Sequence, residues 1–211
     1  MNPNSLSNNI INCLIEDEDG HIWIGTSGGG LNKFDRSANK FYRFKHDPTN
    51  PSSLSNNIVR AIHRDVNGNL WIGTDKGLNL FDTQSSTVTR YMHDEKDPGT
   101  ISSNKISSIT SDKDGVVWIG TQDKGVNRLD VQLNRFERYT FKHKDASSVS
   151  SNMIETIYVD LQDRIWVGTA EGGLDYFDAG TNAFQRNKLV DPSGTISENL
   201  NHIACLLQDS E

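Results

Sequence analysis

Apolar residues alternate with small or polar residues in short runs along the chain. One such run occurs four times as an aliphatic residue, Trp, an aliphatic residue, Gly and Thr, at residues 22–26, 70–74, 117–121 and 165–169. Alternation at every second position is typical of half-buried β-strands, because successive side chains point to opposite faces of a sheet. No segment shows the apolar period of an α-helix. The pattern therefore predicts an all-β protein.

The Trp-containing run divides the chain into repeats. Its tryptophans, Trp23, Trp71, Trp118 and Trp166, are 48, 47 and 48 residues apart. Such a period indicates stacked supersecondary units. Counted from an Asn that precedes each copy (Asn9, Asn57, Asn104, Asn152 and Asn201), the repeats span approximately residues 9–56, 57–103, 104–151, 152–200 and, in part, 201–211.

Each repeat is predicted to contain four strands. The first strands are expected at 11–15, 59–62, 106–109, 154–159 and 203–207, and the second strands are the Trp-containing runs. The third strands are expected at 31–35, 78–82, 126–130 and 174–178, and the fourth at 41–44, 88–91, 136–139 and 184–186. An Asp-led turn ending in Gly joins the first two strands, and Asp163 takes the place of the Gly in the fourth copy. Gly suits such hairpin turns because it accepts a positive φ without a steric cost.

Four short antiparallel strands and one Trp per repeat predict the blade of a β-propeller. One blade cannot bury both faces of its small sheet, so its neighbours must cover them. The 211 residues contain four complete blades and the first strand of a fifth, and they begin and end inside a repeat. Because closed rings have about four to eight blades, we expect one propeller fragment, residues 1–211, that forms a partial ring of a longer protein.

The repeat resembles a known family. Its pattern is Leu-Ser-x-Asn, then Asp-x-x-Gly, then the Trp-containing run followed by a Gly-rich loop, and then Phe-x-Arg-Tyr as at residues 136–139. This pattern resembles the two-component regulator propeller repeat, which fills the periplasmic sensor region of hybrid two-component histidine kinases of Bacteroidetes. The resemblance covers essentially the whole chain.

The resemblance implies a ligand-sensing, non-catalytic, extracytoplasmic segment in the periplasm, with an oligosaccharide as its ligand. It also implies that the rest of a larger propeller and downstream signalling domains act with this segment, and that the full-length protein forms a homodimer. Two alternatives stay open. Streptogramin lyases, which are propeller enzymes, have a broadly similar repeat around Trp, and a propeller can also serve only protein–protein interaction.

The sequence contains none of the short catalytic or phosphate-binding motifs, so we expect this segment not to be an enzyme. Its net charge is −7 and its pI is about 5.3, which argues against a nucleic-acid partner because phosphate contacts need clustered Lys and Arg. With 34% hydrophobic and 23% charged residues, the chain has no apolar run of transmembrane length and no signal peptide.

The repeated chemistry-bearing residues are interpreted as structural. The four Trp recur in step, as packing between blades does and a ligand site does not. The acidic turn at residues 16–20 lacks the ligand pattern of a calcium loop. His46, His93 and His143 are placed at equivalent points of different blades, too far apart to share a metal ion. We therefore expect no metal and no cofactor.

The two cysteines are also interpreted as packing residues. Cys13 and Cys205 occupy a slot, four residues after the repeat's Asn, that the other copies fill with Ala61, Ser108 and Thr156. Such a slot accepts only small side chains. A disulfide would need two sites four blades apart to touch.

Candidate ligand-binding residues are those that differ between copies, because a propeller usually binds through loops that break its repeat. They follow the repeat's Asn or lie in the loop after the second strand, and both sets should emerge from one end of a blade. The set is Asn12, Arg60, Ser107, Glu155, Asp75, Lys76, Gln122, Asp123, Lys124 and Glu171. Arg60 is the first candidate, since its guanidinium offers a planar fork of donors to paired hydroxyls or a carboxylate. The alternative for Arg60 is a surface ion pair, for example with Asp123 or Glu155.

Overall fold

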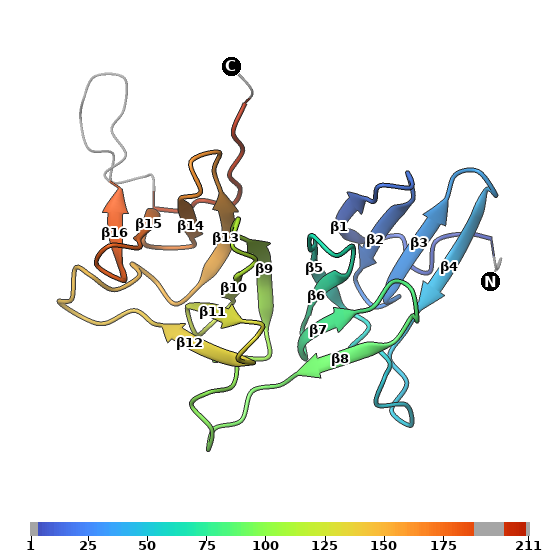
Figure 1. Cartoon of the computed structure of the whole chain (residues 1–211), viewed down its shortest axis with the longest axis horizontal. Helices are drawn as coiled ribbons and strands as arrows, with labels where there is room; N and C mark the ends of the chain where they lie inside the picture. Colours follow the sequence, from blue (N-terminus) through green and yellow to red (C-terminus); the bar gives the residue numbers. More distant parts are fainter. Residues whose placement is uncertain (1–3, 188–200, 210–211) are drawn as a thin grey trace. The chain divides into compact units, whose positions relative to one another are not determined.

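The computed structural model describes residues 4–187 and 201–209, so residues 188–200, which close the fourth repeat, lie outside the described residues. The described residues form sixteen strands in four four-stranded sheets, each with its strands in chain order (Figure 1). No helix among them is long and apolar enough to cross a membrane. The predicted fold class, all-β with four-stranded propeller blades, is confirmed.

The strand bounds agree with the sequence pattern to within two residues. The first two blades consist of β1 (Ile11–Glu16), β2 (Ile22–Thr26), β3 (Leu31–Asp35), β4 (Lys40–Phe44), β5 (Val59–Arg64), β6 (Leu70–Thr74), β7 (Gly77–Phe81) and β8 (Val88–Tyr91). The last two consist of β9 (Ile106–Ser111), β10 (Val117–Thr121), β11 (Val126–Asp130), β12 (Arg135–Tyr139), β13 (Ile154–Val159), β14 (Ile165–Thr169), β15 (Leu174–Asp178) and β16 (Ala183–Asn187).

Residues 201–209 form no strand, although the sequence predicts the first strand of a fifth blade there. They still lie against the fourth blade: the Ile203 amide donates to the Thr169 carbonyl over 3.0 Å, and the Gly173 amide donates to the Asn201 carbonyl over 2.9 Å. In the other blades the first strand pairs with the second strand of the same blade, and no such second strand is among the described residues here.

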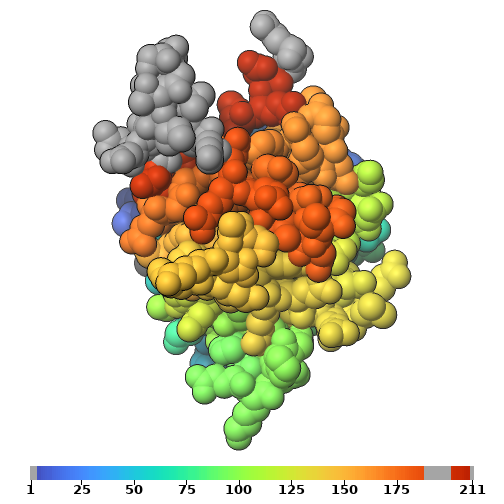
Figure 2. Space-filling model, turned by 90° about the vertical axis from the view of Figure 1, so that its left-hand side faces the viewer, coloured from blue at the N-terminus to red at the C-terminus, as the bar shows by residue number. Residues whose placement is uncertain are grey.

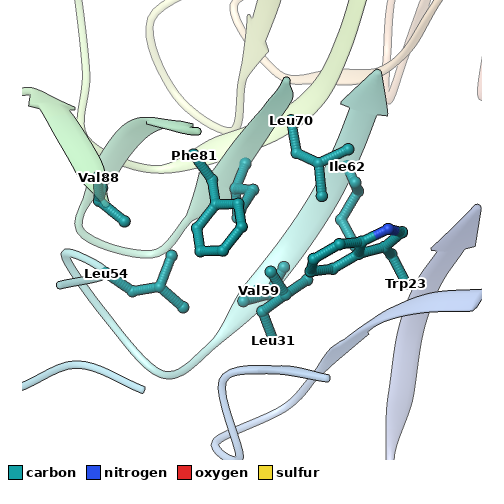
Figure 3. Close-up of a cluster of buried hydrophobic side chains, with 9 residues drawn as sticks. Trp23, Leu31, Leu54, Val59, Ile62, Leu70, Phe81 and Val88 are labelled. Carbon is teal, nitrogen blue, oxygen red and sulfur yellow. The ribbon is translucent and has the colours of Figure 1, made fainter. Parts of the chain in front are cut away.

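The described chain forms two compact units. The first consists of the described residues within 1–93 and 104–109, and the second of those within 94–103 and 110–211. Each has its own apolar core. In the first unit, residues of both blades gather around Trp23, Val59 and Phe81 (Figure 3). In the second unit, the core is built around Trp118, Ile154 and Phe184.

Aromatic side chains link the two blades of each unit in the same way. The Trp23 ring lies 5.8 Å from the ring of Phe44 in its own blade and 5.6 Å, edge to face, from Phe81 of the next blade. In the second unit the Trp118 ring lies 6.0 Å from Tyr139 and 4.7 Å from Phe177. Offset and edge-to-face pairs at these separations stabilise beyond the area they bury. The Trp-containing strand is thus the contact face toward the following blade.

The Gly after Trp is required by a close approach between blades. A Cβ added to Gly25 would lie 2.5 Å from Cys13 Sγ and 2.6 Å from Val59 Cγ1. Gly73 faces Ile106, and Gly168 faces Ile203, in the same manner. The slot of Cys13 pairs with this Gly across the sheet, which explains why the repeats fill it with small side chains.

The linker between blades is fastened to the blade that follows it. Arg90 of β8 donates to the Ser53 carbonyl over 2.8 Å and to the Asn50 carbonyl over 3.0 Å. Arg43 and Arg138 make equivalent bonds, to Ser5 and to the linker at 97–101. An Arg side chain spans several carbonyls at once because its planar guanidinium carries five donors.

A second fastening joins the linker to the third strand. The Asn79 carboxamide accepts from the Ser55 amide over 2.8 Å and donates to the Ser55 hydroxyl over 2.9 Å. Asn32 bonds Ser7 and Asn127 bonds Ser102 by the same reciprocal pair of hydrogen bonds. Each Asn is completely buried, so both bonds are needed to satisfy its polar atoms.

The fourth blade departs from this arrangement because Asp175 stands in place of the Asn. Its Oδ2 accepts from the Ser150 amide over 2.7 Å, but Oδ1 and the Ser150 hydroxyl have no hydrogen bond of good geometry among the described residues. Asp175 is completely buried. This burial raises the pKa of its carboxyl above the usual range, although the Ser150 amide and the positive charge of Arg186 oppose the shift.

Substitution of Gly25 by Ala should destabilise the first unit, since the new methyl group overlaps Val59 and Cys13. The expected loss is about 1–3 kcal/mol of unfolding free energy, the range for overpacked cores. Urea unfolding followed by Trp fluorescence measures it. Gly180→Ala, at an exposed turn without a positive φ, is the control and should change stability by less than about 0.5 kcal/mol. Equal stability of the two variants would contradict the close approach.

Asp175→Asn should stabilise the protein by about 1–3 kcal/mol at neutral pH, because it restores the missing donor to Ser150. The folded-state pKa of Asp175 is raised, so the folded protein binds its proton more tightly than the unfolded chain does. The penalty therefore grows as pH rises above the unfolded pKa, and the gain from the substitution should shrink toward about pH 4.

The matched control is the opposite change, Asn127→Asp, at the equivalent buried site of the third blade. It should cost stability at neutral pH and less in acid. Thermal unfolding across this pH range tests both variants, and a destabilising Asp175→Asn would show that the carboxylate is required.

Candidate functional site

The loop after each second strand is closed at one end of its blade by two recurring bonds. The Thr that ends the strand donates to the carbonyl of the loop's last Gly, as Thr74 does to Gly77 over 2.9 Å. That Gly in turn donates its amide to the carbonyl of the next repeat's Asn, as Gly77 does to Asn104 over 2.7 Å. The loop and the linker that follows the blade therefore meet at one end, as the sequence predicts.

The first candidate, Arg60, forms an ion pair within its own blade. Its Nε lies 2.6 Å from Asp75 Oδ1, and a second guanidinium nitrogen lies 3.2 Å from Oδ2. The hydrogen bond that Arg60 donates to Asp75 raises the pKa of Arg60 above its usual range. Both side chains are partly exposed, at 39% and 26%. The partner is thus neither Asp123 nor Glu155, and Asp75 orients the Arg60 guanidinium at the loop.

The other candidates of the first unit differ in their surroundings. The Asn12 carboxamide donates to the Val59 carbonyl over 2.8 Å, so it joins two blades. Lys76 is exposed, and its amide donates to Thr74 Oγ1. The Ser107 hydroxyl is buried and has no hydrogen bond among the described residues. Of the first unit's candidates, Arg60, Asp75 and Lys76 are the charged ones, and they lie at one end of the second blade.

The remaining candidates belong to the second unit. Gln122, Asp123 and Lys124 follow β10, and the Lys124 amide and carbonyl are bonded to Thr121 and Ser102. Glu155 is exposed on β13. Glu171 is exposed in the loop after β14 and borders a hollow of about 480 Å³. Of this group, the structure places Glu171 alone at that hollow.

We call this hollow the fourth-linker hollow. It is lined by Phe141, His143, Lys144, Ser150, Glu171 and Arg186, together with Ala146 and Gly172. Figure 2 faces this part of the second unit, with the linker in gold and the fourth blade in orange to red. The volume of the hollow falls in the range of about 300–1,000 Å³ that is usual for ligand sites.

Of its lining residues, only Glu171 is among the sequence candidates; Phe141, His143, Lys144 and Arg186 are not. His143 was placed in the slot of His46 and His93, and this placement is wrong. The amides of His46 and His93 donate to Asn57 and Asn104, whereas the equivalent donor to Asn152 is Phe141. The sequence carried this signal, because each donor lies eleven residues before the repeat's Asn.

The acidic turn at the other end of the first blade has structural partners for its oxygens. Asp17, Asp19 and His21 have potential ligand atoms within 4.8 Å of one another. Asp17 Oδ1 accepts from the His21 amide over 2.9 Å, and Oδ2 accepts from Trp23 Nε1 over 2.8 Å. The bonds to Asp17 account for the Asp at the start of this turn.

Cys13 and Cys205 are free thiols. Burial raises the pKa of the Cys13 thiol to about 12, although a hydrogen bond from Gly25 opposes the shift. A thiol with so high a pKa is not a nucleophile at neutral pH, because the thiolate is the reactive form. Its role in the described structure is packing against Gly25 and Val59.

Comparison with solved structures shows the propeller fold in several proteins. The extracellular domain assigned to a hybrid two-component system of B. thetaiotaomicron is 24% identical, with a TM-score of 0.61 over 85% of this chain and 30% of that one. Virginiamycin B lyase from Staphylococcus aureus is 12% identical, with a TM-score of 0.66 over 89% of this chain and 59% of that one. The chain thus spans less than two thirds of either protein.

A search of curated proteins found no match. The profile of the two-component regulator propeller repeat matches residues 5–28, 53–76 and 100–123. Each match runs from the linker, across the Asp-led turn and the Trp-containing strand, into the loop at the candidate end of the blade. Three of the repeats thus match the two-component regulator propeller repeat.

Proposed function

We propose that this chain is a segment of the extracytoplasmic sensor region of a two-component signalling protein, and that it binds an oligosaccharide without catalysis of its own. The observation that carries the proposal is the match of three successive repeats to the two-component regulator propeller. The structural likeness to the extracellular domain of a hybrid two-component system agrees with it at the level of fold. A periplasmic location follows from the same proposal.

The blade ends support a binding role. The core positions repeat from blade to blade, whereas the loops and linkers at one end vary in charge and size, as Arg60, Ser107 and Glu155 do in one slot. Variable polar loops on a rigid scaffold are where binding residues are usually found. The ligand would act by stabilising one of two arrangements of the larger protein, which requires a higher affinity for that arrangement.

A panel of neutral and acidic oligosaccharides tests the proposal by isothermal calorimetry on this chain and on the longer protein that contains it. Saturable binding of at least one oligosaccharide, with no turnover of it, is the expected result. Turnover of a streptogramin by the same protein would instead support a lyase. Binding of no saccharide by either protein would overturn the glycan-sensing proposal.

Arg60→Ala should weaken binding of a saccharide that contacts the first unit. The expected loss is about 1.5–3 kcal/mol of binding free energy, the scale of a lost charge-assisted hydrogen bond. Stability should change little, because an exposed ion pair such as that with Asp75 contributes less than about 1 kcal/mol. Arg36→Ala is the control, since Arg36 forms an exposed ion pair with Glu16 away from these loops. Unchanged affinity in Arg60→Ala would remove Arg60 from the site.

A further inference from the structure

The fourth-linker hollow is formed where the repeat is broken at several positions at once. In the linkers that precede the second and third blades, Asp47 and Asp94 donate their amides to Ser53 and Thr100. The equivalent donor in the fourth linker is Lys142, which donates to Ser148. His143 and Lys144 follow it, so the residues 142–144 are all basic.

This basic stretch stands in a chain of net charge −7. His143 and Lys144 both line the hollow and are exposed. Lys144 has a φ of 64°, which is uncommon for a residue other than Gly, Asn or Asp. The linker thus presents the Lys144 ammonium group at the hollow, and the positive φ of Lys144 costs free energy.

Arg186 supplies a further cation because it does not fasten the linker. Its equivalents Arg43, Arg90 and Arg138 each donate to carbonyls of the linker before their blade. Arg186 is exposed at the hollow, and its charge interacts with the buried Asp175 carboxylate, but its guanidinium donates no hydrogen bond within residues 4–187 and 201–209. Its guanidinium fork is therefore available for a planar anion, which it can bind through two parallel hydrogen bonds.

Asp175, the neighbour of Arg186 on the adjacent strand, contributes to this difference. It pairs with Arg186 across β15 and β16, where the other blades pair an Asn with the Arg. Its carboxyl lacks the donor that ties Asn79 and Asn127 to the linker. The fourth linker therefore has neither the Arg fastening nor the complete Asn fastening of the other linkers.

Two further side chains indicate what accompanies the anion. The Phe141 ring, which stands in the slot of His46 and His93, lines the hollow and is 39% exposed. Glu171 lines it from the loop after β14. An exposed aromatic ring packs against the apolar face of a ring-shaped ligand, and a carboxylate accepts hydrogen bonds from hydroxyls.

The geometry points to the fourth-linker hollow as a binding site for an acidic sugar, with a carboxylate held by Arg186 and Lys144. The ring of the sugar packs on Phe141, and its hydroxyls donate to Glu171. This assignment rests on the proposed function, and it adds the charge class of the saccharide and the site that selects it.

D-Glucuronate, D-glucose and inorganic sulfate are the probes, each titrated into the full chain labelled with ¹⁵N at low ionic strength. Glucuronate should shift the amide signals of Lys144, Glu171 and Arg186 in a saturable manner. Glucose lacks the carboxylate, and sulfate lacks the ring and hydroxyls. Each should bind at least about tenfold more weakly, the factor expected for loss of one charge-assisted bond.

Arg186→Gln and Lys144→Gln should each weaken glucuronate binding about tenfold. Lys144→Gln should leave the melting temperature unchanged, whereas Arg186→Gln should lower it slightly, because it removes the positive charge beside the buried Asp175 carboxylate. Arg135→Gln and Lys113→Gln are matched controls on the same unit. Arg135 begins β12, at the opposite end of the fourth strand from Arg138, and Lys113 lies in the turn before β10. Both controls should bind glucuronate as the parent does.

The outcomes separate the two proposals. Equal affinity for glucose and glucuronate, or unchanged affinity in Arg186→Gln and Lys144→Gln, would overturn the acidic-sugar site. Sulfate binding as strong as that of glucuronate would also overturn it, because a simple anion would suffice. A neutral oligosaccharide that binds the parent and Arg186→Gln equally would leave the sensor proposal standing, whereas binding of no saccharide in the panel would overturn that proposal.

Discussion

In each unit, the first blade buries its Trp-containing strand against the blade that follows it. Trp23 is 2% exposed because Phe81 and Val59 of the next blade lie over it. Trp166, which has no such neighbour among the described residues, is only half-buried and contacts Tyr176 of its own blade. The close approach of Gly25 to Val59 depends on the same contact. The residues of this interface therefore recur once in every repeat, which sets the period of the sequence.

The blades could be predicted from the sequence because their signals are local. Alternating side chains and an Asp-led turn specify a hairpin wherever they occur. Asp163, which replaces the turn Gly in the fourth copy, still adopts a positive φ of 62°, comparable to the 84° of Gly68, so the turn is kept. Residues 201–209 show the limit of a local signal. Their apolar pattern predicts a strand, but a strand is defined by a pairing partner.

The candidate site was only partly predictable, for two physical reasons. The ion pair of Arg60 with Asp75 depends on where two loops meet, which spacing along the chain does not reveal. At the fourth-linker hollow, Asp175 and Arg186 lack hydrogen bonds that the equivalent Asn and Arg make in the other blades. The sequence does not reveal this loss, because both residues keep the polar character of their positions in the repeat. The sequence does identify Phe141 as the equivalent of His46 and His93, because it lies eleven residues before Asn152, whereas residue type alone suggests His143.

The bonds from Arg90 to Asn50 and Ser53 set the boundaries of a blade as a physical unit. They tie the last strand to the linker before the first strand, and Arg138 does the same with residues 97–101. The linker 94–103 accordingly groups with the second unit, which holds β10 to β12 of the third blade, whereas residues 104–109 at the start of β9 group with the first unit. By these bonds, a block begins at the linker and ends with the fourth strand. Duplication or exchange of repeats in evolution would preserve every internal bond of a blade if the break fell between the fourth strand and the linker, rather than at the Asn where the sequence motif begins.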